Sequence, residues 1–76
     1  MTYYGVLLEV SGFGNLDSYF DGLSSVARME GSFLETSLDD TRFLFLFSED
    51  EIAQGFLDRA RGFRYVSSGQ RRDREG

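Results

Sequence analysis

Residues 42–47, with the sequence RFLFLF, constrain the fold of this chain more than any other feature. Successive side chains of a strand point to opposite faces, so the three Phe side chains share one face and the two Leu side chains share the other. A strand that is apolar on both faces belongs inside a sheet that is covered on both sides. The chain has only 76 residues and no cysteine, so this strand must lie in a single small core held by apolar packing.

Three further segments are predicted as strands. Residues 3–10 (YYGVLLEV) alternate in the same way and form a second strongly apolar strand. Residues 32–38 are joined to 41–47 by the polar pair Asp39 and Asp40, a connection that permits a hairpin. Residues 63–67 are short but compatible with a final strand.

Two helices are predicted between these strands. Asn15 can cap a helix whose apolar residues recur at helical spacing, and Gly31 is a fitting end for it. Ser48 and Glu51 have the spacing of a capping box, which predicts the start of a second helix that ends near Gly62.

The order β-α-β-β-α-β of these segments resembles the ferredoxin-like fold, an α+β fold with a four-stranded antiparallel sheet and two helices on one face. In that fold the first and third strands form the central pair, and these are the two most apolar strands here. We therefore expect one compact α+β domain over residues 1–67. Residues 68–76 are polar and rich in Arg, and we expect them to form a mobile tail.

Charge is distributed unevenly along the chain. Residues 1–58 carry eleven acids and two bases, for a net charge of −9, whereas residues 59–76 carry six Arg and two acids, for +4. An acidic body repels nucleic acid and anionic membranes, and it suits a partner protein with a basic surface. It also keeps a small domain in solution, which is the simpler explanation.

The residue types that are missing narrow the possible chemistry. The chain has no His, Cys or Lys, so the commonest general base, the thiol nucleophile and the usual ligands of transition metals are absent. We expect no enzyme activity, no metal and no cofactor. No apolar run is long enough to cross a bilayer and the first residues lack a signal peptide's charged start, so we expect a cytoplasmic protein.

The acidic residues are the first candidates for a partner-binding site. If the carboxyl ends of the first and third strands lie together, Asp17 and residues 49–51 gather at one end of the domain, and Glu30 meets the 39–40 turn at the other. Helix capping and the helix dipole also explain the acids of residues 49–51. The candidate partner-binding residues are Asp17, Glu30, Phe33, Glu35, Asp39, Asp40, Glu49, Asp50 and Glu51.

The uncovered face of the sheet is the second candidate. Two helices cover one face, and the other still carries Leu7, Leu44 and Leu46. Partial exposure of a few apolar side chains is ordinary, but a partner or a second copy of the chain can also cover them.

These observations favour a binding protein. We expect an acidic domain that docks on a nucleic-acid-binding protein and inhibits it by mimicking nucleic-acid charge. In size and charge the chain resembles phage-encoded antagonists of host defence such as anti-CRISPR proteins. The alternative is a ferredoxin-like module that forms a homodimer through its open sheet face and acts as a regulatory or assembly subunit.

Overall fold

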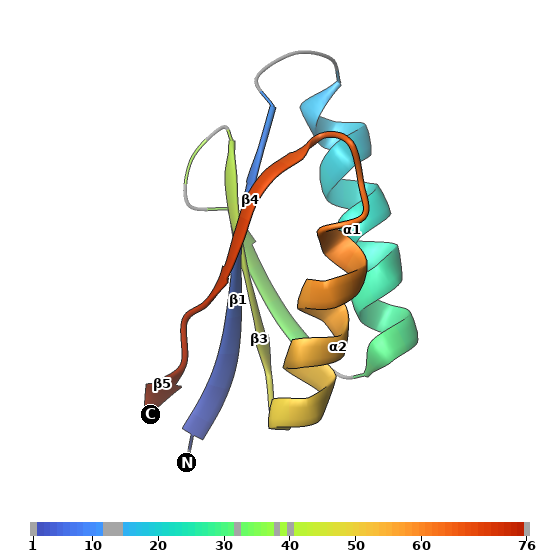
Figure 1. Cartoon of the computed structure of the whole chain (residues 1–76). Helices are drawn as coiled ribbons and strands as arrows, with labels where there is room; N and C mark the ends of the chain where they lie inside the picture. Colours follow the sequence, from blue (N-terminus) through green and yellow to red (C-terminus); the bar gives the residue numbers. More distant parts are fainter. Residues whose placement is uncertain (1, 12–14, 32, 38, 40, 76) are drawn as a thin grey trace.

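The computed structural model describes residues 2–11, 15–31, 33–37, 39 and 41–75, and for residues 33–37 and 75 it describes the backbone alone (Figure 1). The elements, in chain order, are β1 (Thr2–Val10), α1 (Leu16–Glu30), β2 (Phe33–Ser37), β3 (Arg42–Phe47), α2 (Asp50–Ala60), β4 (Val66–Arg71) and β5 (Arg74–Glu75). No helix in the described part of the chain is long and apolar enough to cross a membrane.

The strands form an antiparallel sheet in the order β2-β3-β1-β4, and β5 pairs with the beginning of β1. Both helices lie on one side of this sheet (Figure 1). The α+β class, the two helices and the antiparallel pairing of β1, β2 and β3 are confirmed. The predicted count of four strands is wrong, because β5 adds a short strand that the sequence pattern does not indicate.

The C-terminal part of the chain differs most from the prediction. The strand expected over residues 63–67 begins only at Val66 and continues to Arg71, so the domain boundary expected after residue 67 falls inside β4. The residues predicted to be a tail supply most of β4 and all of β5. They pair with β1 because the edge of that strand otherwise leaves backbone N–H and C=O groups unpaired. Polar residues are tolerated there because many of their side chains remain exposed.

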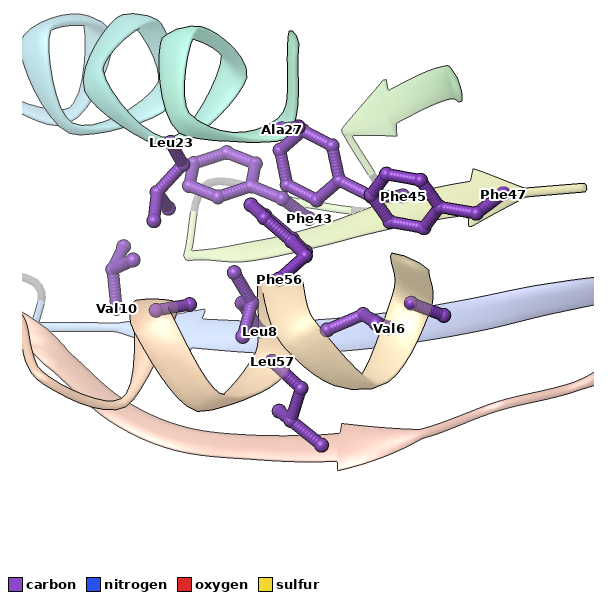
Figure 2. Close-up of a cluster of buried hydrophobic side chains, with 12 residues drawn as sticks. Val6, Leu8, Val10, Leu23, Ala27, Phe43, Phe45, Phe47, Phe56 and Leu57 are labelled. Atoms are coloured by element: carbon purple, nitrogen blue, oxygen red, sulfur yellow. The ribbon is translucent and has the colours of Figure 1, made fainter. Parts of the chain in front are cut away.

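The core lies between the helices and the sheet (Figure 2). The three Phe side chains of β3 are buried on the face toward the helices, as the alternation predicts. Phe56 of α2 packs between two of them: its ring centroid lies 4.9 Å from that of Phe45 and 5.3 Å from that of Phe47. The other fully or nearly fully buried apolar residues are Val6, Leu8, Val10, Leu23, Ala27, Leu44, Ala53, Leu57 and Ala60.

The first helix begins and ends where local sequence signals place it. The Asn15 side chain accepts a hydrogen bond of 3.1 Å from the Ser18 amide, and the Gly31 amide donates to the carbonyl of Ala27. The capping box predicted for the second helix is wrong. The first helical hydrogen bond runs from the Ala53 amide to the Glu49 carbonyl, so the N-cap residue is Glu49 and not Ser48. Glu49 makes no side-chain capping bond.

Candidate functional site

The antiparallel pairing of β1 and β3 rearranges the acids that the sequence analysis grouped together. Glu9, near the end of β1, is paired with Arg42 at the start of β3, and the Val10 amide donates to the Thr41 carbonyl at 2.8 Å. The carboxyl ends of the two strands are therefore at opposite ends of the sheet. The expected grouping of Asp17 with residues 49–51 is wrong.

The actual grouping follows the chain direction in Figure 1. The start of α1, with Asp17, lies at the same end of the molecule as Asp39 in the β2–β3 connection. The end of α1, with Glu30, lies beside α2 at the opposite end. There the Glu30 carboxylate pairs with Arg59 at 2.6 Å.

Three of the candidate acids are neutralised by arginines. Besides Glu30, Asp39 pairs with Arg42 and Asp50 with Arg71, each at 2.6 Å. The hydrogen bond from Arg42 and a second from the Thr41 amide lower the pKa of Asp39 below its usual value. These ion pairs reduce the negative field that the sequence predicts.

The remaining candidate residues are not all described by the structure. Asp17, Glu49 and Glu51 are exposed, and in the described part of the chain none of them has an ion pair. Asp40 lies outside the described residues. The backbones of Phe33 and Glu35 lie in β2, opposite Phe47 and Phe45, but their side chains lie outside the description.

The open face of the sheet is more covered than expected. Leu7 and Leu46 are half-buried, as an exposed sheet face predicts, but Leu44 is only 3% exposed. Leu44 lies opposite Leu7, on the face away from the helices. The segment that follows β4 lies on the same face, where Arg72 and Arg74 line a pocket together with these two leucines.

Together these side chains form a small pocket on the open face. Leu7 and Leu44 are its apolar lining, and three arginines complete it, Arg42, Arg72 and Arg74. Its volume is about 210 Å³. We call it the arginine pocket. It is a concentration of positive charge on a chain whose net charge is −5.

Gly5 determines the path of the chain at this pocket. The Arg72 amide donates to the Gly5 carbonyl at 2.8 Å, and the Gly5 amide donates to the Asp73 carboxylate at 3.3 Å. A Cβ atom on residue 5 would collide with the Arg72 carbonyl. Only glycine allows this close approach, which brings residues 72 and 74 to the open face.

Arg71 anchors the same segment from the other side of the sheet. Its guanidinium contacts the carboxylates of Asp50 and Asp73 at 2.6 and 3.0 Å, donates to Gln54 at 3.2 Å, and lies over the Tyr4 ring. Partial burial acts to lower the pKa of Arg71, but the hydrogen bonds to the two carboxylates outweigh it and raise that pKa. The end of β4 is thereby joined to both α2 and β1.

The three arginines of the pocket differ in how their charge is compensated. Arg42 is paired with Asp39, and its strand register places it opposite Glu9. Arg72 and Arg74 are exposed and have no ion pair among the described residues. Among the described residues the pocket therefore has an excess of positive charge, which an anionic group can satisfy.

The pocket is not predicted from the sequence, because the polar, Arg-rich residues 68–76 are typical of a solvated tail. One local signal was present: Arg72 and Arg74 are two residues apart, so in an extended chain they share a face. The sequence does not show that this face forms a pocket with Leu7 and Leu44. No group of acidic residues in the described part of the chain is arranged to hold a metal ion.

An aromatic stack at the other end of the molecule is the second noteworthy cluster. The rings of Tyr19 and Tyr65 are parallel with centroids 4.1 Å apart, and Phe63 stacks on Tyr65 at 5.4 Å. Burial, and then the neighbouring Tyr19, raise the pKa of Tyr65. These rings extend the core beneath the turn that precedes β4.

Comparison with known proteins gives a fold and no family. No protein-family model and no curated protein matches the chain. Among solved structures, the structured domain of Boca from Drosophila melanogaster superposes with a TM-score of 0.78 over 99% of this chain and 100% of that chain. This superposition shows that the chain has the same fold as the Boca domain. The two sequences are 16% identical.

Proposed function

We propose that this chain is a non-catalytic protein-binding domain that docks through the sheet face opposite its helices. The observation that carries the proposal is the arginine pocket, where an apolar lining meets three arginines, two of which have no ion pair among the described residues. Half-buried Leu7 and Leu46 extend the apolar surface around it. Arg is enriched at protein interfaces because it combines apolar contact with several hydrogen-bond donors.

A protein partner fits this face better than nucleic acid does. Nucleic acid is a long polyanion whose binding depends on many basic contacts along its backbone. Here residues 1–58 have a net charge of −9, so most of the domain repels such a ligand. A protein partner can present one local acidic group and leave the rest of the surface uncharged.

Photo-crosslinking tests the docking face directly. A photo-reactive amino acid is placed at position 46 on the open face, and in a matched chain at position 29, where Met29 is 74% exposed on the helix side. In cells of the source organism, we expect a discrete adduct with another protein from position 46 and none from position 29. Equal labelling from both positions, or no adduct from either, would contradict the proposal.

A second copy of the chain is the competing occupant of this face. It would give an adduct of twice the chain's mass from position 46. Substitution of Leu46 by Glu would then shift the mass in solution from dimer to monomer. Leu46 is the better position for this test because Leu44 is buried, and a charge at residue 44 would disturb the fold.

A second candidate function rests on the exposed carboxylates. Asp17, Glu49 and Glu51 retain exposed negative charge. In this candidate function they dock on the basic surface of a nucleic-acid-binding protein and inhibit it by occupying the site of its nucleic acid. Charges of this kind mainly steer association and set its register.

Charge reversal distinguishes this candidate from docking by the open face. Glu49→Arg combined with Glu51→Arg changes the exposed acids and leaves Asp50 in its ion pair with Arg71. The control is Asp21→Arg with Asp58→Arg, two exposed acids elsewhere on the helices. From a nuclease-treated lysate, the first variant alone should lose nucleic-acid-binding proteins that wild type retains. Equal retention by wild type and both variants would reject the charge-mimic function.

A further inference from the structure

We propose that the arginine pocket recognises a carboxylate side chain next to an apolar residue on an acidic peptide segment of the partner. This inference rests on the proposed docking face and names the chemistry that the face selects. It comes from the pocket's size, its charge and the way the fold positions its arginines.

The size of the pocket limits what it can hold. Sites for cofactors and drug-sized molecules have volumes of roughly 300–1,000 Å³, whereas the arginine pocket has about 210 Å³. That space suits one or two side chains of a peptide. Its composition matches such a pair, since half-buried Leu7 offers an apolar contact and the arginines offer donors.

The charge of the pocket selects a carboxylate. Guanidinium groups bind carboxylates through paired N–H donors, which gives geometric selectivity as well as attraction. Asp39 already occupies the Arg42 guanidinium with contacts of 2.6 Å, so Arg42 is held in place as one wall of the pocket. Arg72 and Arg74 are the groups that meet the incoming carboxylate.

The fold positions these two arginines before any ligand arrives. The backbone of residue 72 is hydrogen-bonded to Gly5, and residue 74 is paired with Tyr3 in the β5–β1 ladder. The neighbouring Arg71 is held by Asp50 and Asp73. A backbone that is already ordered lowers the entropy lost on binding, although the two side chains remain exposed.

Fluorescence anisotropy with designed peptides tests the inference. The probe is a fluorescein-labelled peptide with a central Leu-Glu-Leu-Glu-Leu run, and its control has Gln in place of both Glu residues. We expect the Glu peptide to bind the wild-type chain about tenfold more tightly at low salt, as charge-assisted hydrogen bonds predict. Equal affinity for the two peptides would overturn carboxylate recognition.

Two double variants locate the binding site. Arg72→Gln with Arg74→Gln should weaken binding of the Glu peptide about tenfold, to the level of the Gln peptide. Arg28→Gln with Arg64→Gln removes the same charge from exposed positions outside the pocket and should leave binding unchanged. Equal weakening by both pairs would show a general charge effect and contradict the assignment to the pocket.

Titration of the wild-type chain with the peptide, followed by NMR, tests the site without any substitution that could disturb the fold. The methyl resonances of Leu7 and Leu44 should shift when the Glu peptide is added, whereas that of Met29 on the helix side should not. Shifts confined to Met29 or to the helices would overturn the site. A single-stranded DNA probe should not bind at the same concentrations. If DNA binds the wild-type chain and the double variant Arg72→Gln with Arg74→Gln abolishes that binding, the occupant of the pocket is nucleic acid and not a peptide.

Failure of this inference differs from failure of the proposed function. If position 46 crosslinks a partner but the Glu and Gln peptides bind equally, the docking face stands and carboxylate recognition fails. If position 46 gives no adduct, the docking function itself fails. If the wild-type chain forms a dimer and the double variant Arg72→Gln with Arg74→Gln is a monomer, the pocket binds a second copy of the chain. That result would overturn the proposal that it binds an acidic peptide.

Discussion

The carbonyl oxygen of Arg72 occupies the space that a side chain on Gly5 would require. This contact brings the chain after β4 to the open face of the sheet and so creates the arginine pocket. Replacing Gly5 by Ala should displace residues 72–74. We expect the free energy of unfolding to fall by about 1–3 kcal/mol, as for other overpacked sites, and peptide binding at the pocket to weaken with it.

Chemical denaturation and the anisotropy assay measure both effects of Gly5→Ala. The matched control is Gly22→Ala in α1, where the new Cβ would lie 3.1 Å from the hydroxyl of Tyr65 and meet no backbone atom of another element. Ala also favours the helix by up to about 1 kcal/mol over Gly. The control should therefore be neutral or stabilising, and a Gly5→Ala variant that behaves in the same way would show that the close approach is unimportant.

Removal of the Arg71 side chain should loosen the end of the sheet. Its side chain is 24% exposed, and its guanidinium contacts Asp50, Asp73 and Gln54. Because the partner carboxylates are largely solvated, we expect Arg71→Ala to lower the free energy of unfolding by only about 1–2 kcal/mol. Hydrogen exchange at β4 amides should accelerate in this variant and not in Arg64→Ala. Unchanged exchange at β4 would contradict the anchoring role.

The acid sensitivity of the domain should depend partly on Asp39. The hydrogen bond from Arg42 and that from the Thr41 amide lower the pKa of Asp39 below 3.8 in the folded chain. The ionised Asp39 side chain therefore contributes fully to stability above pH 3.8, and this contribution is lost as the pH falls through the lower pKa of the folded chain. Asp39→Asn removes this dependence.

Thermal unfolding of wild type and Asp39→Asn across the acid range provides the measurement. We expect the wild type to be the more stable at neutral pH and the difference to disappear as Asp39 is protonated. Asn keeps an oxygen that can accept from the Thr41 amide, so the comparison removes the charge and its hydrogen bond from the Arg42 guanidinium and keeps the hydrogen bond within the turn. A difference that stays constant between neutral and strongly acidic pH would refute this account.

Phe56 should be the most damaging of the core positions to truncate. Its ring contacts those of Phe45 and Phe47, and it is fully buried. Phe56→Ala should cost about 3–5 kcal/mol, a large share of the roughly 4–11 kcal/mol expected for a domain of this length. Denaturant titration should show a much lower midpoint, while exposed Met29→Ala should change stability by less than about 0.5 kcal/mol. A small effect at residue 56 would mean that the core can close around the cavity.

The sequence by itself determined the elements whose signals are local. Alternating apolar residues located β1 and β3, and the faces they assigned are the observed ones, with the three Phe side chains of β3 turned to the helices. Asn15 and Gly31 marked the ends of α1 because a capping bond needs only neighbouring residues. Each of these features depends on contacts within a few residues or on burial of one face.

Only the tertiary structure decided where residues 68–75 go and which charges meet. Val66–Arg71 has little apolar pattern of its own, and it becomes a strand because the unpaired edge of β1 supplies its hydrogen-bond partners. The antiparallel register then sets Asp39 near one end of the sheet and Glu30 at the other, and the pairing of the last residues with β1 brings Arg72 and Arg74 to the pocket that Leu7 and Leu44 line. These relationships join residues that are far apart in the chain, so no local pattern encodes them.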